Sequence, residues 1–142
     1  MAIFETADQL YACIGGMFMH LREDKQTQKQ LGKQKFRVQF TFSTPTATIG
    51  LTTENGEQSI LLNQRIENPD VELIMSGDVA HYFWMGDINV MEAITKRQIV
   101  PVGSLARIMT LVPLIKAAIR FYPEHYQTYQ IDPQNHYDQL TD

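Results

Sequence analysis

Strict alternation of apolar and polar residues between positions 36 and 43 dictates how this chain can fold. Phe36, Val38, Phe40 and Phe42 take every second position, and polar residues fill the gaps. Successive side chains of a β-strand point to opposite faces, so this period of two predicts a strand with one aromatic face and one polar face. Exposure of the aromatic face to water is unfavourable, so another part of the chain must cover this face.

Four more segments extend this strand into a sheet. Ala47–Thr53 alternates again, and Asn55-Gly56, where both residues tolerate positive φ, predicts a hairpin turn into a third strand at Gln58–Ile66. Val71–Ser76 is predicted as the fourth strand. Gln98–Val102 is predicted as the fifth, at a sheet edge, because it contains a proline that cannot donate to the ladder. The first four strands follow one another through short turns, which favours antiparallel pairing.

Helical patterns flank these strands. Apolar residues recur at three- and four-residue steps between Thr6 and Asp24, which predicts a first helix, whereas the polar stretch 22–35 predicts a helix end and a loop. Val79–Trp84 and Val90–Lys96 are predicted as short helices, each after a capping residue. With one apolar face of the sheet to cover, we expect an α+β fold in which the helices pack on the sheet.

Length and charge restrict the class of protein. A chain of 142 residues fits one domain, and its formal net charge of −4 does not favour a nucleic-acid binder. A single cysteine, Cys13, excludes an intramolecular disulfide and fits a reducing compartment. No basic region precedes the first apolar stretch, and the later apolar stretch carries charges. We therefore expect no signal peptide, no membrane span and a cytoplasmic location.

Residues that usually perform catalysis or bind metals do not form familiar patterns here. None of the four histidines has metal-ligand spacing to another, and a thiol such as Cys13 on an apolar helix face is usually an inert small hydrophobe. The stretch 102–106 lacks the second glycine of a nucleophile elbow, and no glycine-rich phosphate loop occurs. We expect no enzyme activity, no metal and no cofactor.

Basic residues concentrate early in the chain, where half of them lie between positions 22 and 37. Lys29, Lys33 and Lys35 in this cluster predict a transient contact with an anionic headgroup or membrane. The simpler alternative, a solvated charged face, remains open.

The most apolar segment, 105–119, opens the last predicted helix. It is apolar almost all round, and such a helix is either buried on every side or lines an apolar cavity. Pro113 is expected to kink or divide this helix, and Pro123 to end it. Methionines at positions 75, 85, 91 and 109 add side chains that adapt to variable ligands. The pattern leaves both a plain core and a ligand cavity open.

Short segments of the second half resemble, in their order, the sterol carrier protein type 2 family. The resemblance covers about Pro69–Ile115 and rests on four stretches: Pro69–Ser76, Gly86–Asn89, Ile99–Gly103 and Leu111–Leu114. The chain also departs from the family. Members often have Gly-Lys before the edge strand, where this chain has Arg97-Gln98. Pro101 is unusual within that strand, and this chain continues beyond Pro123, where the family's domain usually ends.

The resemblance implies a five-stranded antiparallel sheet covered by helices, with an apolar tunnel between the sheet and the C-terminal helices. It implies non-enzymatic binding or transfer of a fatty acid, fatty acyl-CoA, sterol or phospholipid. On this interpretation residues 1–123 form the lipid-binding domain and 124–142 a C-terminal extension. We expect the tunnel to be lined by Phe83, Trp84, Met91, Ile94, Leu105, Ile108, Met109, Val112, Ile115 and Ile119.

Two other interpretations belong to different classes. In one, the protein is an accessory or dimerisation module of a lipid-related pathway, and its own side chains fill the cavity. This interpretation includes a homodimer. In the other, the protein is an enzyme acting on small apolar substrates, which the missing nucleophile–base pair disfavours.

Overall fold

The computed structural model describes residues 2–31, 35–54 and 57–131. Five strands form one sheet, in the spatial order β3-β2-β1-β4-β5, so the expected α+β fold with a five-stranded sheet is confirmed. The strands are β1 (Phe36–Ser43), β2 (Ala47–Glu54), β3 (Glu57–Leu62), β4 (Val71–Ser76) and β5 (Ile99–Val102). The turn predicted at positions 55 and 56 lies outside the described residues, although β2 and β3 pair antiparallel on either side of it. β5 lies at the sheet edge, as its proline predicts.

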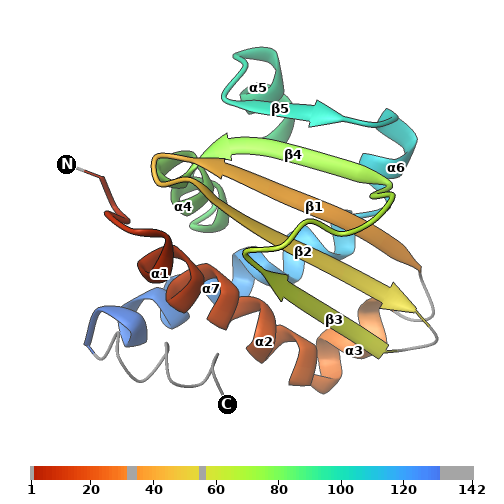
Figure 1. Ribbon diagram of the computed structural model, residues 1–142. Helices are drawn as coiled ribbons and strands as arrows, with labels where there is room; N and C mark the ends of the chain where they lie inside the picture. The colour runs from red at the N-terminus through yellow and green to blue at the C-terminus, as the bar shows by residue number, and fades with distance from the viewer. Residues whose placement is uncertain (1, 32–34, 55–56, 132–142) are drawn as a thin grey trace.

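The sheet is mixed, so the prediction of a purely antiparallel sheet is wrong. β1 pairs antiparallel with β2 but parallel with β4, and Phe40 lies opposite both Ile49 and Leu73. The reason is the connection between β3 and β4. It does not turn back at once, but runs across the sheet to the far side of β1, as Figure 1 shows.

This connection buries the centre of the sheet's polar face. The Ile66 backbone N–H donates to Gln39 Oε1 over 2.9 Å, and Gln39 Nε2 donates to the Phe40 carbonyl over 3.2 Å. Gln39 is wholly buried, and these bonds satisfy its amide. Gly50 allows the close approach, because a Cβ there would lie 2.4 Å from Ile66 Cγ2.

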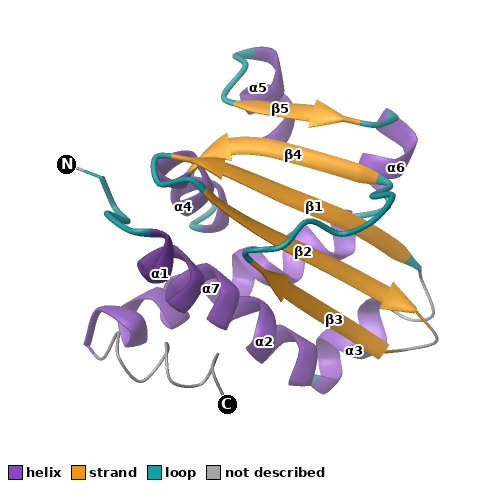
Figure 2. Ribbon diagram, in the orientation of Figure 1, coloured by secondary structure: helices purple, strands orange, loops and turns teal. Residues whose placement is uncertain are grey.

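Helices cover the aromatic face of the sheet (Figure 2). The first helix comprises α1 (Ala7–Leu10), a π-helical turn η1 (Tyr11–Gly15) and α2 (Gly16–Glu23). Phe18 of α2 stacks on Phe40 of β1 with a ring-centroid distance of 5.6 Å. The other helices are α3 (Lys25–Leu31), α4 (Gly77–Trp84), α5 (Val90–Thr95), α6 (Leu105–Met109) and α7 (Val112–Ile131). The predicted last helix is divided into α6 and α7, as expected from Pro113, which lies in the first turn of α7.

Two helix predictions are wrong. The stretch expected as a loop contains α3, which begins because Asp24 accepts hydrogen bonds from the Thr27 backbone N–H and hydroxyl at 2.9 and 2.7 Å. Pro123 does not end the last helix. A proline inside a helix costs about 3 kcal/mol, but Tyr122, His125 and Tyr129 are buried on either side of it and their packing offsets that cost. α7 thus crosses the boundary at residue 123 suggested by the sequence.

No helix in the described ranges is both long and apolar enough to cross a bilayer.

Candidate functional site: a cavity beside the last helix

A cavity of about 530 Å³ lies against one side of α7. Within the described part of the chain, the lining comprises Val112, Pro113, Lys116, Ile119 and Arg120, which recur at three- and four-residue steps and so share one face of the helix. Ligand pockets commonly measure about 300–1,000 Å³, so the space is large enough for a small organic molecule. Of these described lining residues, three are apolar and two are cationic. This combination suits a ligand with an apolar body and a negative group.

One cationic residue of the cavity is shared with a second hollow. Arg120 also borders a space of about 240 Å³ that α7 forms with the end of α2 and the start of α3. The hydrogen bonds from Thr27, together with the positive charge of Arg120, hold the pKa of Asp24 below its ordinary value. Asp24 therefore remains a carboxylate near Arg120, with which it lines the second hollow. Lys116, the other cation of the cavity, is not among the described residues that line this hollow.

The structure distributes the ten predicted tunnel residues over three environments. Val112 and Ile119 border the cavity. Phe83, Trp84, Ile108 and Ile115 are buried in the core, and Ile94 is half-buried. Met91, Leu105 and Met109 are exposed. Contact of any of these residues with a lipid stays a prediction.

Sequence reasoning missed three residues of the cavity: Pro113, Lys116 and Arg120. The predicted lining consists of apolar side chains alone, whereas Lys116 and Arg120 follow Val112 by four and eight residues on the same helix face. A search for cations in register with the apolar stripe of the last helix would have found them.

Little free space remains where the sheet meets α2 and α7. Phe18, Phe36, Leu51 and Leu114 help to line a gap of only about 10 Å³, which is about the volume needed for one water molecule. The hydroxyl of Thr53, which also borders this gap, is buried and has no hydrogen-bond partner in the part of the chain described. The predicted tunnel is not shown between these described residues and stays a prediction.

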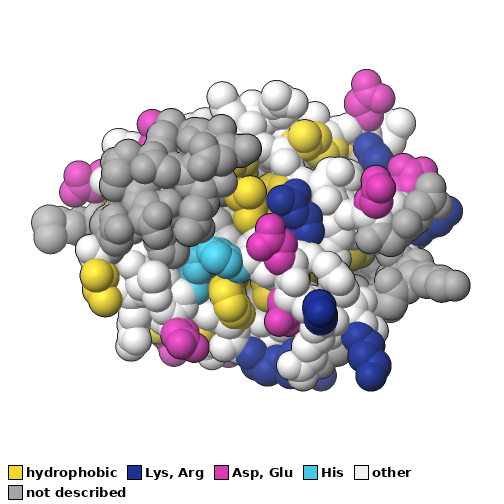
Figure 3. All heavy atoms as spheres, turned by 90° about the horizontal axis from the view of Figure 1, so that it is seen from below, with side chains coloured by type: hydrophobic (Ala, Val, Ile, Leu, Met, Phe, Trp, Pro, Cys, Tyr) yellow, Lys and Arg dark blue, Asp and Glu magenta, His cyan; other side chains and the backbone are white. Residues whose placement is uncertain are grey.

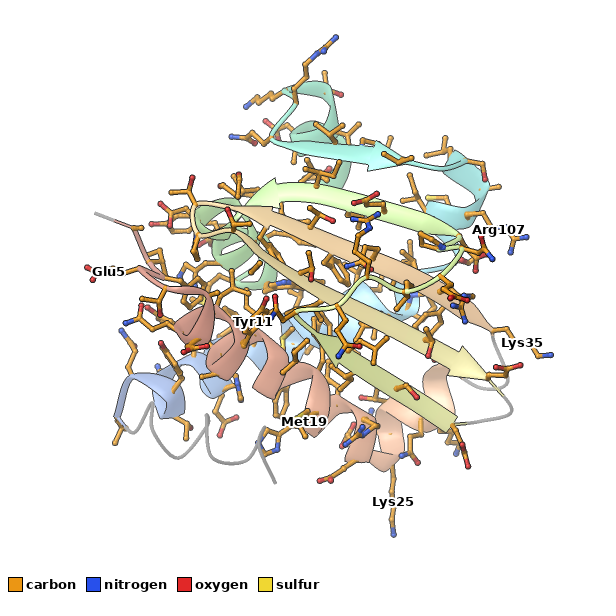
Figure 4. The ribbon with its side chains drawn as sticks, in the orientation of Figure 1. Glu5, Tyr11, Met19, Lys25, Lys35 and Arg107 are labelled. Atoms are coloured by element: carbon orange, nitrogen blue, oxygen red, sulfur yellow. The ribbon has the colours of Figure 1, made fainter. Side chains whose placement is uncertain are left out.

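The lysines predicted to contact an anionic headgroup or membrane are exposed where the structure describes them. Lys29 and Lys35 are exposed, and Lys33 lies outside the described residues. Lys25 and Lys35 extend away from the body of the protein, and basic side chains gather at one side of the face beneath α2 and α3 (Figures 3 and 4). Membrane contact through Lys29, Lys33 and Lys35, and a homodimer, stay predictions.

A separate polar cluster lies inside the protein, between η1, α4 and α7. Tyr122 Oη lies 2.9 Å from His81 Nδ1 and 3.4 Å from Cys13 Sγ. His125 Nε2 donates to the Cys13 carbonyl, which lies in the π-helical turn η1, over 2.8 Å. These bonds join the first and last helices through four side chains.

Burial favours the uncharged forms of Cys13, Tyr122 and His81. It raises the pKa of the Cys13 thiol to about 12 and the pKa of the Tyr122 hydroxyl far above its ordinary value. Burial also lowers the pKa of His81, against a smaller opposing effect of the Asp78 and Asp87 carboxylates. A thiol that stays protonated is a poor nucleophile, so the cluster is suited to support the structure rather than to attack a substrate. No group of three potential metal ligands occurs among the described residues.

The buried histidine predicts a pH dependence of stability. Because the folded protein holds the pKa of His81 below its usual value of 6.5, the unfolded chain binds more protons below that pH. The free energy of unfolding should therefore carry the full His81 contribution above pH 6.5 and lose it as the pH falls towards the folded-state pKa. Urea unfolding across this range should show a smaller loss for His81→Gln than for the wild type. Equal losses would contradict the prediction.

Comparison with known structures identifies the fold. Neither known protein families nor curated proteins match this sequence. The sterol carrier protein domain 2 of Helicoverpa armigera superposes with a TM-score of 0.60 at 17% identity, over 76% of this chain and 88% of that domain. A Thermus thermophilus protein described as possibly a sterol carrier protein gives a TM-score of 0.60 at 10% identity, over 88% of this chain and 90% of that protein.

A third similar structure is part of a much larger protein. The sec-alkylsulfatase Pisa1 of a Pseudomonas species superposes with a TM-score of 0.53 at 12% identity, over 67% of this chain. This chain spans only 14% of the length of that enzyme. At these identities the similarities show a shared fold.

Proposed function

We propose that this chain, which has the fold of sterol carrier protein 2 domains, binds a single-chain anionic lipid such as a fatty acid and carries it without chemical change. The observation that carries the proposal is the cavity on α7, where Val112, Pro113 and Ile119 adjoin Lys116 and Arg120. The names of the similar domains support a sterol or lipid as the class of ligand. The cavity supports a preference for a charged one.

Apolar burial and charge play different parts in this binding. Each buried methylene contributes about 0.8 kcal/mol, so about ten methylenes supply roughly 8 kcal/mol before the costs of association. Those costs are about 4–15 kcal/mol, and the net affinity is modest, as a carrier that releases its cargo requires. A carboxylate beside Lys116 then adds a charge-assisted hydrogen bond that an uncharged sterol cannot make.

A competition experiment tests the proposal. Delipidated protein is titrated with a fluorescent fatty acid, and oleate, oleoyl-CoA and cholesterol compete for the probe. We expect oleate to displace the probe and cholesterol to displace it poorly. Lys116→Ala should weaken oleate binding about tenfold, because hydrogen bonds to charged groups contribute about 1.5–3 kcal/mol.

Lys25→Ala is the matched control, since Lys25 is an exposed lysine of α3 that does not line the cavity. Its affinity for oleate should equal that of the wild type. Cholesterol binding as tight as oleate binding, or equal losses in the two lysine variants, would contradict the assignment of the headgroup to Lys116.

One observation favours a second function. The gap between the sheet and α2 and α7 is nearly filled, as expected for an accessory or dimerisation module whose own side chains occupy the interior. In that case the folded protein would bind none of the lipids, and its mass in solution would be that of a dimer.

A further inference from the structure

Arg120 borders two spaces, the cavity on α7 and the hollow that α7 forms with the end of α2 and the start of α3. Among the described residues that line these spaces, the charged ones are Lys116, Arg120 and Asp24. Lys116 belongs to the cavity, Asp24 to the hollow, and Arg120 to both. Arg120 is therefore the side chain that a carboxylate of the protein shares with an anionic ligand in the cavity.

The fold holds the Asp24 carboxylate at this hollow. Its Oδ2 atom accepts hydrogen bonds from the Thr27 backbone N–H over 2.9 Å and from the Thr27 hydroxyl over 2.7 Å. Thr27 is 3% exposed, so the donor of both bonds is itself fixed by its surroundings. The bonds from Thr27, followed by the positive charge of Arg120, lower the pKa of Asp24 and keep it ionised. The adjacent Lys25 extends away from the body of the protein (Figure 4).

Lys116 and Arg120 are unequal partners for a ligand. They stand four residues apart on α7, so their side chains are neighbours on one helix face. A headgroup in the cavity competes with Asp24 for Arg120, whereas Lys116 is not among the described residues that share the hollow with this carboxylate. The attraction between a cation and a headgroup is proportional to the headgroup charge. In free energy, the attraction that Asp24 withholds is therefore about twice as large for a doubly charged headgroup as for a singly charged one.

We propose that Asp24 determines the charge specificity of the cavity, because it competes with the ligand for Arg120 and so disfavours doubly charged headgroups. Asp24 is a positioning residue that acts through Arg120, since it lines the hollow and not the described part of the cavity wall. The favoured class is a single-chain lipid with a carboxylate or sulfate-ester headgroup, and the disfavoured class is a phosphate monoester. This inference rests on the proposed function, because it concerns the charge preference of the same cavity.

Two matched ligands separate charge from shape. Tetradecyl sulfate and tetradecyl phosphate share their chain and a tetrahedral headgroup, but at about pH 8 the sulfate carries one negative charge and the phosphate nearly two. Each competes with a fluorescent fatty acid for the protein, below the concentration at which it forms micelles. Asp24→Asn should strengthen binding of the sulfate about twofold and of the phosphate about fourfold, because the gain in free energy doubles with the charge and exposed charges interact weakly. Both gains should shrink as salt rises.

Asp24→Asn changes the charge and little else, because asparagine caps a helix about as well as aspartate does. Glu23→Gln is the matched control. It removes the same charge from the preceding residue, which is exposed and is not among the described residues that line either space. Its affinities should stay close to those of the wild type. Equal gains in the two variants, or equal gains for the two ligands in Asp24→Asn, would overturn the proposal.

A double-mutant cycle tests whether Asp24 acts through Arg120. In an Arg120→Gln background there is no guanidinium to compete for, so Asp24→Asn should lose most of its effect on both ligands. Gains that persist undiminished without Arg120 would overturn the proposal. Wild-type protein that binds neither oleate nor the two tetradecyl ligands would overturn the proposed function as well. Oleate binding by the wild type, with an unchanged ratio of sulfate to phosphate affinity in Asp24→Asn, would overturn the role of Asp24 alone.

Discussion

Val112→Asp is expected to reduce the affinity for oleate about 100-fold or more. Val112 forms part of the apolar wall of the cavity, and a carboxylate there would have to lose its hydration beside an acyl chain. The penalty for burying a charge is several kcal/mol even after relaxation, and each 1.4 kcal/mol is a factor of ten in affinity. The variant should still fold, because Val112 is only partly buried and a negative charge favours the first turn of a helix.

Val112→Asn is the control for shape, since asparagine has nearly the same size as aspartate and carries no charge. Its affinity for oleate should fall between those of the wild type and Val112→Asp. Thermal unfolding of all three proteins should show that the changes in affinity do not follow stability. Val112→Asp with wild-type affinity would mean that the lipid binds elsewhere.

Trp84→Ala is expected to lower the free energy of unfolding by about 3–5 kcal/mol. Trp84 is fully buried, and its ring makes edge contacts with Phe18 and Phe40 at centroid distances of 5.6 and 5.9 Å. A domain is usually stable by only about 5–15 kcal/mol, so this loss is large. Urea unfolding followed by circular dichroism would measure it, since the chain has a single tryptophan and the variant none.

Trp84→Phe tests a second property of this side chain. Trp84 Nε1 has no hydrogen-bond partner among the described residues, and an unpaired buried N–H costs about 1–3 kcal/mol. Phenylalanine keeps most of the ring and removes that cost, so the loss should be much smaller than in Trp84→Ala. A loss as large as that of alanine would mean that the N–H has a partner in solution.

Local patterns predicted the sheet well, but not the path of the chain between strands. The alternation at Phe36–Ser43 identified β1 and its buried side chains, because strand period and burial are local properties. Nothing local distinguishes Gln39 from the other polar residues of the strand. It is buried because the connection at Ile66 crosses the sheet, and that contact depends on Gly50 of another strand.

The candidate site was only partly predictable for a similar reason. Hydrophobicity located the helix and two wall residues, Val112 and Ile119. The cations of the wall share their face, but the same residue types occur on any solvated helix, and only packing shows which of them borders a cavity. The predicted helix end at Pro123 was wrong because the helix-breaking tendency of proline is a local property. The contact between His125 and Cys13 of the first helix, which lies far away in the sequence, is not.

The place of β1 in the sheet has a consequence for synthesis on the ribosome. β1 is central, yet one of its partners, β4, begins 28 residues after β1 ends, and α7, which packs on α2, follows later still. At about 5–20 residues per second, several seconds pass between the synthesis of β1 and that of α7. The complete fold can therefore form only after α7 has been synthesised, and until then chaperones can bind the incomplete sheet.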